Sequence, residues 1–204
     1  MAYSKFTIID LRRKFGLRDA KKSLFTQIEP IKPSKWLEHT LSIQKKLPIH
    51  SEKAKSEFII VPILTDVWEQ SGERFSIHSG INLDADSEQG LNGECDFILS
   101  ADTEKSYFLK SPIFTIVEAK RDDFLGGVPQ CAAQMLGANR FNALDGRELD
   151  AIYGCVTDGT EWLFLKLKET SLLIDDKTYF TKDLEELLGV FSFIINESSA
   201  SITS

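Results

Sequence analysis

The run from Ile113 to Lys120 constrains the fold of this chain more than any other stretch. After Pro112 it consists of bulky hydrophobic residues and one threonine, and it ends in Glu118, Ala119 and Lys120. Such a run predicts a strand that is buried on both faces. Because side chains alternate along a strand, Glu118 and Lys120 project to the same side. Two opposite charges at the end of a core strand cost free energy, so we expect them to have a chemical role.

A second predicted strand, residues 93–100, lies just upstream and carries Asp96. The polar segment 101–111 suits the loop of a hairpin. Antiparallel pairing of the two strands would bring Asp96 opposite Glu118. Two neighbouring carboxylates supply the hard oxygen ligands that Mg²⁺ prefers, and Lys120 beside them can orient water or stabilise a phosphorane.

The order of Asp96 followed by Glu118-Ala119-Lys120 resembles the PD-(D/E)XK nuclease superfamily. More narrowly, it is similar to the nuclease domain of type I restriction motor subunits and to small cyanobacterial restriction-endonuclease-like proteins. The proline of the motif is absent, since Cys95 precedes Asp96. The resemblance covers about residues 51–168.

This resemblance implies an α/β fold, a restriction-endonuclease-like mixed β-sheet flanked by helices, here with an extra helical N-terminal segment. It also implies hydrolysis of DNA phosphodiester bonds that leaves a 5′-phosphate. The expected cofactor is Mg²⁺, with Mn²⁺ as a substitute, and the expected metal ligands are Asp96 and Glu118. Lys120 would position the attacking water or offset the developing negative charge.

The resemblance implies further site residues on two predicted helices. Glu57, on the helix 51–69, takes the place of an accessory acid; the alternative is an exposed surface glutamate. Gln130 and Gln134 share one face of the helix 130–144. Related nucleases place a glutamine near the start of this helix at the active site, so Gln130 fits best and Gln134 second; the alternative is a pair of exposed amides. A Thr-Asp-Gly-x-x-Trp hairpin at 157–162 also follows the nuclease helix in type I domains.

Charge is distributed unevenly along the chain. Residues 1–55 contain 13 Lys or Arg and 5 Asp or Glu, a net +8, whereas residues 56–204 contain 11 against 26, a net −15. The basic part could contact nucleic-acid phosphates, which supply most sequence-independent affinity. The alternative is a solvated basic surface docked on an acidic one. The candidate phosphate-binding residues are Arg12, Arg13, Lys14, Lys45 and Lys46.

Periodicity, capping residues and turn residues predict the remaining elements. We divide the chain into a basic helical N-terminal segment (1–50), a nuclease-like domain (51–197) and a flexible tail (198–204). The predicted helices cover residues 7–15, 35–46, 51–69, 130–144 and 184–195. The predicted strands cover residues 75–83, 93–100, 113–120, 151–157 and 162–167, followed by a small edge hairpin around Asp175 and Asp176.

Composition narrows the function classes. With 204 residues, of which 42% are hydrophobic, the chain can bury one core. The three cysteines are scattered and lack the spacing of zinc ligands, so we expect free thiols and a cytoplasmic location. No apolar run is long enough for a membrane span, so we expect none. No phosphate-binding glycine loop is present, so we expect no nucleotide cofactor. We expect the three histidines to be structural or solvent-exposed rather than catalytic; they are His39, His50 and His78.

Two hypotheses follow from the sequence. In the first, the chain is a Mg²⁺-dependent endonuclease that acts on DNA, for which the resemblance implies a homodimer; RNA is left open as a substrate. In the second, it is a catalytically weak or inactive module of nuclease fold that serves binding or assembly. The acidic net charge of −7 motivates the second hypothesis.

Overall fold

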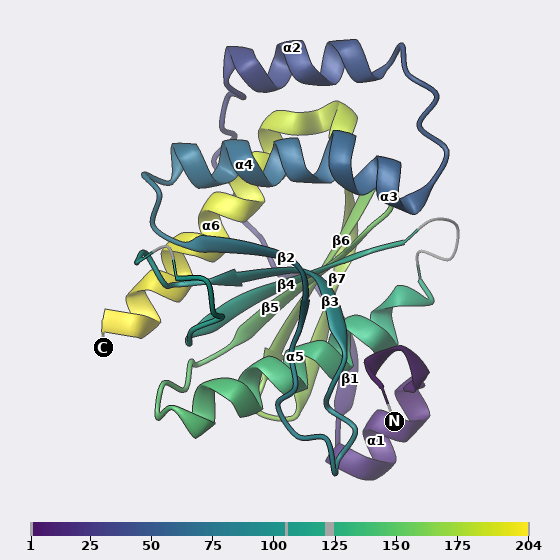
Figure 1. The fold of residues 1–204 in the computed structure, drawn as a ribbon, viewed down its shortest axis with the longest axis vertical. Coiled ribbons are helices and arrows are strands. Elements are labelled where there is room, and N and C mark those ends of the chain that lie inside the picture. Colours follow the sequence, from purple (N-terminus) through teal and green to yellow (C-terminus); the bar gives the residue numbers. More distant parts are fainter. Residues whose placement is uncertain (1, 105, 121–124, 204) are drawn as a thin grey trace.

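Strand β4 (Ile113–Ala119) lies near the middle of a mixed sheet, and all seven of its residues are buried. The structure, a computed structural model, describes residues 2–104, 106–120 and 125–203. Within these ranges the sheet has seven strands in the order β1-β7-β6-β5-β4-β3-β2 (Figure 1). The other strands are β1 (Arg18–Lys22), β2 (Ser76–Asn82), β3 (Glu94–Ser100), β5 (Ile152–Thr157), β6 (Glu161–Lys168) and β7 (Ser171–Phe180).

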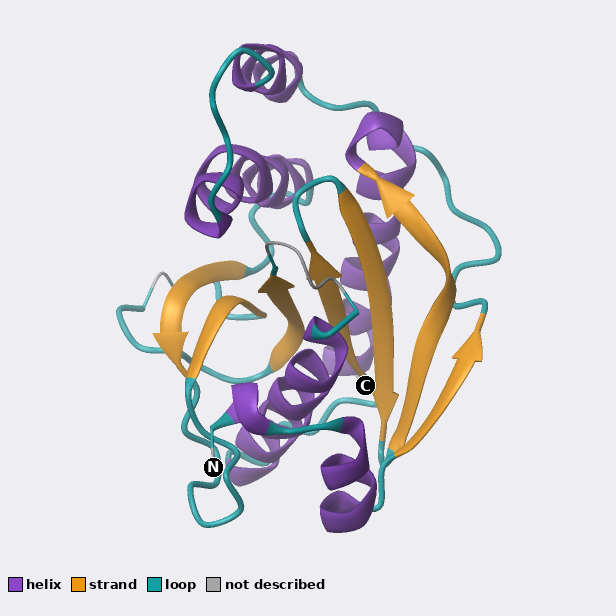
Figure 2. Ribbon diagram, turned by 90° about the vertical axis from the view of Figure 1, so that its right-hand side faces the viewer, coloured by secondary structure: helices purple, strands orange, loops and turns teal. Residues whose placement is uncertain are grey.

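The connection between β4 and β5 sets the geometry of the site. These strands are parallel neighbours, and helix α5 (Gly127–Leu144) joins them across one face of the sheet. Strands β3 and β4 pair antiparallel, as do β5 and β6. The chain is therefore α/β, with a mixed sheet flanked by helices, in agreement with the general class predicted from the sequence. Figure 2 shows helices on both sides of the twisted sheet.

Each face of the sheet has its own hydrophobic core. Helices α4 (Val61–Gln70) and α6 (Leu184–Thr203) pack on one face, together with Leu37 of helix α2 (Lys35–Gln44). Helix α5 covers the other face, with helix α1 (Ile8–Phe15) and the turn η1 (Tyr3–Lys5) packed beside it. None of the helices in the described part of the chain combines the length and hydropathy that a membrane span requires.

The N-terminal segment is built into both cores. Tyr3 and Leu11 are buried with α5, whereas Phe25 and Leu37 are buried on the opposite face. The Tyr3 hydroxyl donates a hydrogen bond of 2.8 Å to the carbonyl oxygen of Leu83. Strand β1 pairs parallel with β7 at the edge of the sheet. The sequence predicted only helices in this segment and missed this strand.

Capping residues explain several helix boundaries. The Thr7 hydroxyl accepts a hydrogen bond from the amide of Asp10, whose carboxylate accepts one from the amide of Thr7, and Gly16 ends α1 in the left-handed region. Ser34 and Ser51 cap α2 and the short helix α3 (Glu52–Lys55) in the same way. These starts agree with the sequence prediction.

Three predicted elements differ from the structure. The helix expected at 51–69 consists of α3, a π-helical turn η2 (Ser56–Ile60) and α4, with Pro62 in the first turn of α4, where proline is tolerated. The predicted edge hairpin around Asp175 is wrong, because β7 is one ten-residue strand. After the turn η3 (Thr181–Asp183), α6 continues to Thr203, so the residues from 198 to 203, predicted as a flexible tail, are helical.

Candidate active site

The pairing of β3 with β4 brings two carboxylates together. Phe97 lies opposite Val117 in the antiparallel register, and the next positions along the strands are Asp96 and Glu118. The Asp96 carboxylate accepts a hydrogen bond of 2.7 Å from the backbone amide of Ala119. Asp96 is half-buried, whereas Glu118 is only 1% exposed. The predicted juxtaposition of these acids therefore matches the register of the strands.

Two side chains hold the buried carboxylate of Glu118 from opposite sides. The Lys120 ammonium lies 2.6 Å from Oε1 of Glu118. The Gln134 amide nitrogen, on α5, donates a hydrogen bond of 2.7 Å to Oε2. Both carboxylate oxygens thus have a partner, and one partner comes from the helix that crosses the sheet.

The first turns of α5 also position Lys120. The Lys120 ammonium donates a hydrogen bond of 3.0 Å to Oε1 of Gln130. A Cβ atom placed on Gly127 would lie 2.9 Å from Cγ of Lys120 and 2.7 Å from Val156, so only glycine allows this close approach. Gln130 and Gln134 therefore both face the site, one through Lys120 and the other through Glu118.

Burial and like charge raise the pKa values of both acids. For Glu118, burial and then the nearby charge of Asp96 raise the pKa to about 7, against the opposing effects of Lys120 and Gln134. Burial also raises the pKa of Asp96, although the hydrogen bond from Ala119 and the charge of Lys120 work against it. Burial lowers the pKa of Lys120, but its charge interaction and hydrogen bond with Glu118 outweigh this, so its pKa is raised and it stays cationic.

A third acid approaches from α3, and it is not the one that the sequence indicated. The charge of Glu52 contributes, behind larger causes, to the raised pKa values of Asp96 and Lys120. The Glu57 side chain is 54% exposed and lies 3.8 Å from the ammonium of Lys53. Glu52 and Glu57 are five residues apart, which corresponds to a rotation of roughly 140° beyond one full helical turn. Their side chains therefore point in different directions.

The predicted phosphate-binding residues fall into two separate groups. Figure 1 shows α1, which carries Arg12, Arg13 and Lys14, at the opposite end of the molecule from α2, which Lys45 and Lys46 follow. The Arg12 guanidinium makes two hydrogen bonds to Asp19, of 2.7 and 2.9 Å. Lys14 donates a hydrogen bond of 2.6 Å to the carbonyl oxygen of Gln89. The five cations therefore do not form one surface.

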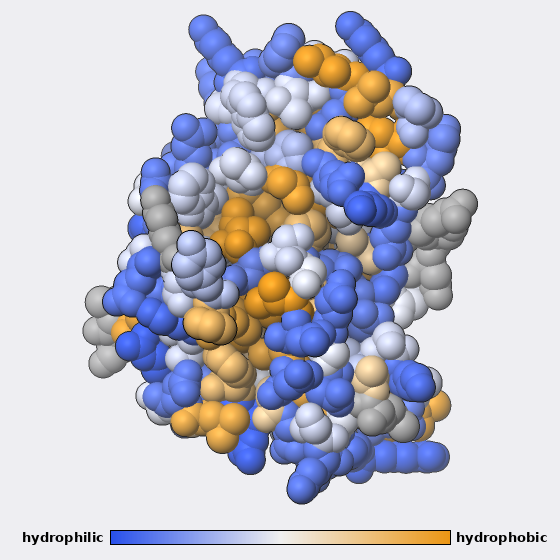
Figure 3. Space-filling model, viewed as in Figure 1, coloured by the Kyte–Doolittle hydropathy of each residue, from blue (hydrophilic) through white to orange (hydrophobic). Residues whose placement is uncertain are grey.

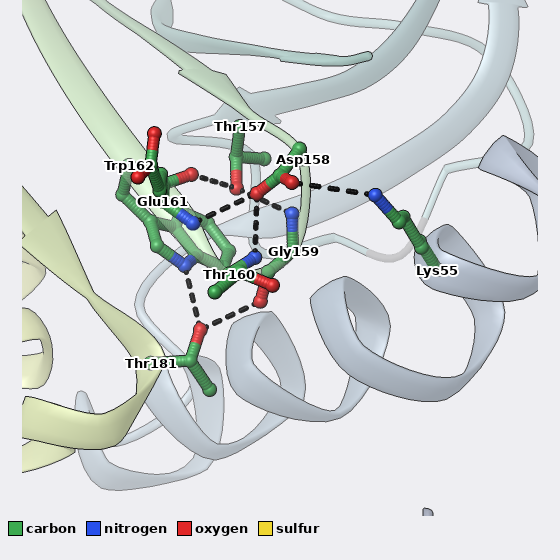
Figure 4. Close-up of polar contacts among 8 residues, drawn as sticks. All are labelled: Lys55, Thr157, Asp158, Gly159, Thr160, Glu161, Trp162 and Thr181. Atoms are coloured by element: carbon green, nitrogen blue, oxygen red, sulfur yellow. Dashed lines mark hydrogen bonds and ion pairs between the residues drawn. The ribbon is translucent and has the colours of Figure 1, made fainter. Parts of the chain in front are cut away.

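The β5–β6 turn is joined to the end of α3 through Lys55 (Figure 4). Oδ1 of Asp158 accepts hydrogen bonds of 2.8 Å from the amides of Thr160 and Glu161, and Oδ2 lies 3.3 Å from the Lys55 ammonium. Thr181 ties the same turn to Trp162 of β6, since its hydroxyl donates a hydrogen bond of 2.7 Å to the carbonyl oxygen of Gly159 and accepts one of 2.9 Å from the indole nitrogen. Asp158 thus forms the turn, as expected, and also anchors α3.

The residues present fit a divalent cation. Asp96 and Glu118 offer hard oxygen donors whose mutual repulsion a cation would relieve. Oε1 of Gln134, which is fully buried, has no hydrogen-bond partner among the described residues, leaving a third oxygen unsatisfied next to Glu118. Among the described residues, no group of three or more His, Cys, Asp or Glu side chains is arranged to hold a metal ion. Mg²⁺ commonly binds through one or two carboxylates and completes its shell with water and substrate phosphate.

Comparison of the chain with protein-family models, curated proteins and solved structures gave no significant match. The chemistry of the site is therefore inferred from its own geometry.

Proposed function

We propose that this protein is a divalent-metal-dependent nuclease that hydrolyses DNA phosphodiester bonds. One observation carries the proposal: Asp96, Glu118 and Lys120 converge at the ends of two paired strands, and Glu118 is buried with a pKa raised to about 7. Strongly perturbed titratable groups that converge in this way are more common at functional sites than elsewhere. The predicted PD-(D/E)XK arrangement of two acids and a lysine is compatible with this geometry.

Asp96 and Glu118 would hold the cation through their carboxylate oxygens. Bound there, Mg²⁺ would lower the pKa of a coordinated water and offset negative charge on the phosphate. Glu118 performs this role only when it is deprotonated, which its raised pKa permits at and above neutral pH. Gln134 keeps the Glu118 carboxylate in place through the 2.7 Å hydrogen bond.

Lys120 provides the positive charge at the site. Its ammonium carries three donors, and two of them are directed to Glu118 and Gln130. The third can hold the attacking water or the developing negative charge of the phosphoryl oxygens. Gln130 restricts the orientation of the lysine, so its contribution is positioning.

Cleavage of supercoiled plasmid DNA in the presence of Mg²⁺ or Mn²⁺ tests this proposal. Asp96→Asn and Lys120→Ala are expected to slow cleavage by about 10²-fold or more, because each removes a group that acts in the transition state. Glu104→Gln is a matched control, since Glu104 lies in the loop between the other ends of β3 and β4. Wild-type rates in both site variants would refute the assignment.

A second candidate function is a binding or assembly module without useful catalysis. The observation in its favour is that Lys120 and Gln134 already satisfy both oxygens of Glu118 without a cation. In that case Lys120 would serve as the permanent counterion of Glu118. The wild-type protein would then cleave no more plasmid than its Asp96→Asn variant, although both would remain folded.

A further inference from the structure

The ammonium of Lys120 contacts a carboxylate oxygen that a divalent cation would also need. It lies 2.6 Å from Oε1 of Glu118, and its charge acts on Asp96 as well. Only 2% of the Glu118 side chain is exposed, so water screens this ion pair weakly. Lys120 therefore already supplies positive charge to both of the expected metal ligands.

The carboxylate of Glu118 cannot hold the ammonium and a divalent cation equally well. Its other oxygen, Oε2, accepts the 2.7 Å hydrogen bond from Gln134. A cation bound to this carboxylate would lie close to the ammonium, and like charges at short range repel strongly where water is excluded. Binding of a cation to Glu118 therefore requires that the Lys120 ammonium move away.

A second acceptor for the ammonium is already in place on α5. Lys120 donates a hydrogen bond of 3.0 Å to Oε1 of Gln130, which is a neutral group and not one of the expected ligands. The lysine stem runs close to the start of α5, since a Cβ atom on Gly127 would lie 2.9 Å from its Cγ and 3.3 Å from its Cε. The stem is thus confined by the helix, while the charged end has two acceptors. The ammonium can leave Glu118 and keep Gln130.

The surroundings of the ammonium also allow this exchange. The Lys120 side chain is 22% exposed, so its charged end reaches water. Glu52, in the first turn of α3, acts electrostatically on Asp96 and Lys120, and Figure 3 shows hydrophilic surface around α3. Displacement of the ammonium from Glu118 therefore does not require it to cross an apolar layer.

We propose that Lys120 is an exchangeable counterion. In the metal-free protein it neutralises Glu118, and when a divalent cation binds it moves from Glu118 to Gln130 and becomes available to a substrate phosphate. The ammonium is thereby withheld from phosphate until the cation is bound, so metal binding precedes productive substrate binding. This inference rests on the proposed function, because that function makes Asp96 and Glu118 the metal ligands.

Calorimetric titration with Mn²⁺ at pH 8, without DNA, tests the exchange. Lys120→Met is expected to tighten Mn²⁺ binding about tenfold, because it removes a competing contact and a positive charge. If Lys120→Met does not fold, Lys120→Gln gives the same comparison, since glutamine keeps a hydrogen-bond donor for Glu118 without the charge. Lys53→Met is the matched control. The Lys53 side chain is 83% exposed and its ammonium lies 3.8 Å from Glu57, so this variant should change the affinity by less than about twofold.

A double-mutant cycle with Gln130→Leu gives a readout that a purely structural role of Lys120 would not change. In the presence of Lys120, Gln130→Leu should weaken Mn²⁺ binding about threefold, because Gln130 is then the protein acceptor that the displaced ammonium retains. In the Lys120→Met background, Gln130→Leu should have no effect, since no ammonium remains to be held. In a crystal structure with Mn²⁺, Nζ of Lys120 should lie beyond about 4 Å from Glu118 and within hydrogen-bond distance of Gln130.

The outcomes separate this inference from the proposed function. Tighter Mn²⁺ binding in the Lys120 variant, together with a Gln130 effect that depends on Lys120, supports the exchange. Equal or weaker binding in the Lys120 variant, or an equal Gln130 effect in both backgrounds, overturns the exchange and leaves the nuclease assignment to the plasmid assay. Exchange without Mg²⁺-dependent plasmid cleavage by the wild type would refute the nuclease function and leave a metal-binding module. Absence of Mn²⁺ binding in the wild type and in the variants would overturn both.

Discussion

Glu118 combines burial, a neighbouring carboxylate and an ammonium within one small site. The first two favour its protonated form, and the ammonium of Lys120 favours the charged form without fully compensating them. A group in this balance responds strongly to anything that adds or removes positive charge. At the residue scale, the account therefore depends on how Glu118 titrates.

The raised pKa of Glu118 makes the stability of the metal-free protein depend on pH. The folded state holds this proton up to about pH 7, whereas the unfolded chain releases it near pH 4.5. The stabilisation is thus fully present below about pH 4.5 and is lost as the pH rises through about 7, on the order of 3 kcal/mol in total. Denaturant unfolding at pH 5 and pH 8 measures this change.

Glu118→Gln provides the comparison, because glutamine is similar in shape and does not titrate. We expect the loss of unfolding free energy between pH 5 and pH 8 to be markedly smaller in this variant. Asp96, whose pKa is also raised, accounts for part of the remaining slope. Equal slopes in the two proteins would show that Glu118 is ionised normally in the folded state.

Glu52 and Glu57 form a matched pair of glutamates on consecutive turns of the same helical segment. Glu52 adds negative potential at Asp96, whereas Glu57 faces solvent beside Lys53. Glu52→Gln should raise the Mg²⁺ concentration for half-maximal DNA cleavage roughly threefold to tenfold, since weaker negative potential attracts the cation less. Glu57→Gln should leave it unchanged, and the reverse pattern would restore Glu57 as the accessory acid.

The sequence predicted that Asp96 and Glu118 would be neighbours, and it named Glu57 rather than Glu52 as the accessory acid. A hydrophobic run that ends in charge identifies Glu118 and Lys120, and strand pairing identifies Asp96. To choose between Glu52 and Glu57, one must know which face of the helical segment 52–60 points toward Asp96. The Lys55–Asp158 ion pair and the π-helical turn η2 determine that face. The sequence did contain a signal in favour of Glu52: Ser51 caps α3, and this places Glu52 in the first helical turn.

At the scale of elements, α5 is the part of the fold that assembles the site. Its first two turns supply Gln130 and Gln134, and its close approach to the sheet depends on small residues. A Cβ atom on Gly154 of β5 would lie 2.4 Å from the sulfur of Met135, so strand and helix are in direct contact there. The site is consequently sensitive to the seating of the helix.

Gly137 fixes the position of the N-terminal turn against α5. A Cβ atom there would lie 2.1 Å from the Tyr3 hydroxyl oxygen, which is itself hydrogen-bonded to Leu83. Gly137→Ala should therefore lower the free energy of unfolding by about 1–3 kcal/mol, despite the higher helix propensity of alanine. Thermal or denaturant unfolding gives the measurement.

A double-mutant cycle with Tyr3→Leu isolates the steric cause of this loss. Leucine leaves room for the added methyl group, so Gly137→Ala should be much less destabilising in that background. An undiminished effect would mean that the alanine acts elsewhere in the helix.

The elements that were not predicted correctly lack the regular spacing of hydrophobic residues that indicates a helix or a strand. Strand β1 reads Arg-Asp-Ala-Lys-Lys and is mostly exposed, so its stability comes from backbone pairing with β7. The Asp175-Asp176 pair resembles a turn, yet Asp175 is buried, and its carboxylate accepts hydrogen bonds from the amide of Leu24 and the hydroxyl of Tyr179. Both features depend on a partner distant in sequence, β7 for β1 and Leu24 for Asp175, whereas capped helices and the apolar strand β4 were predicted from local pattern.

At the scale of the whole molecule, the candidate active site lies at one end of the sheet. The acids Asp96 and Glu118 lie there, whereas Arg12 of α1 is paired with Asp19 of β1. The basic residues of the first quarter of the chain are therefore divided between structural ion pairing and the surface near α2. We therefore expect this protein to contact a nucleic-acid strand close to the candidate active site rather than over a broad basic face.

Titration of the protein with Mn²⁺, followed by the electron paramagnetic resonance of free Mn²⁺, tests the central claim most directly. We predict a binding site that Asp96→Asn and Glu118→Gln each weaken by about tenfold or more, because each removes a charged oxygen ligand. Affinity should be higher at pH 8 than at pH 6, since a proton competes for Glu118, whose pKa is about 7. Absence of Mn²⁺ binding, or equal affinity in the wild type and both variants, would contradict the account.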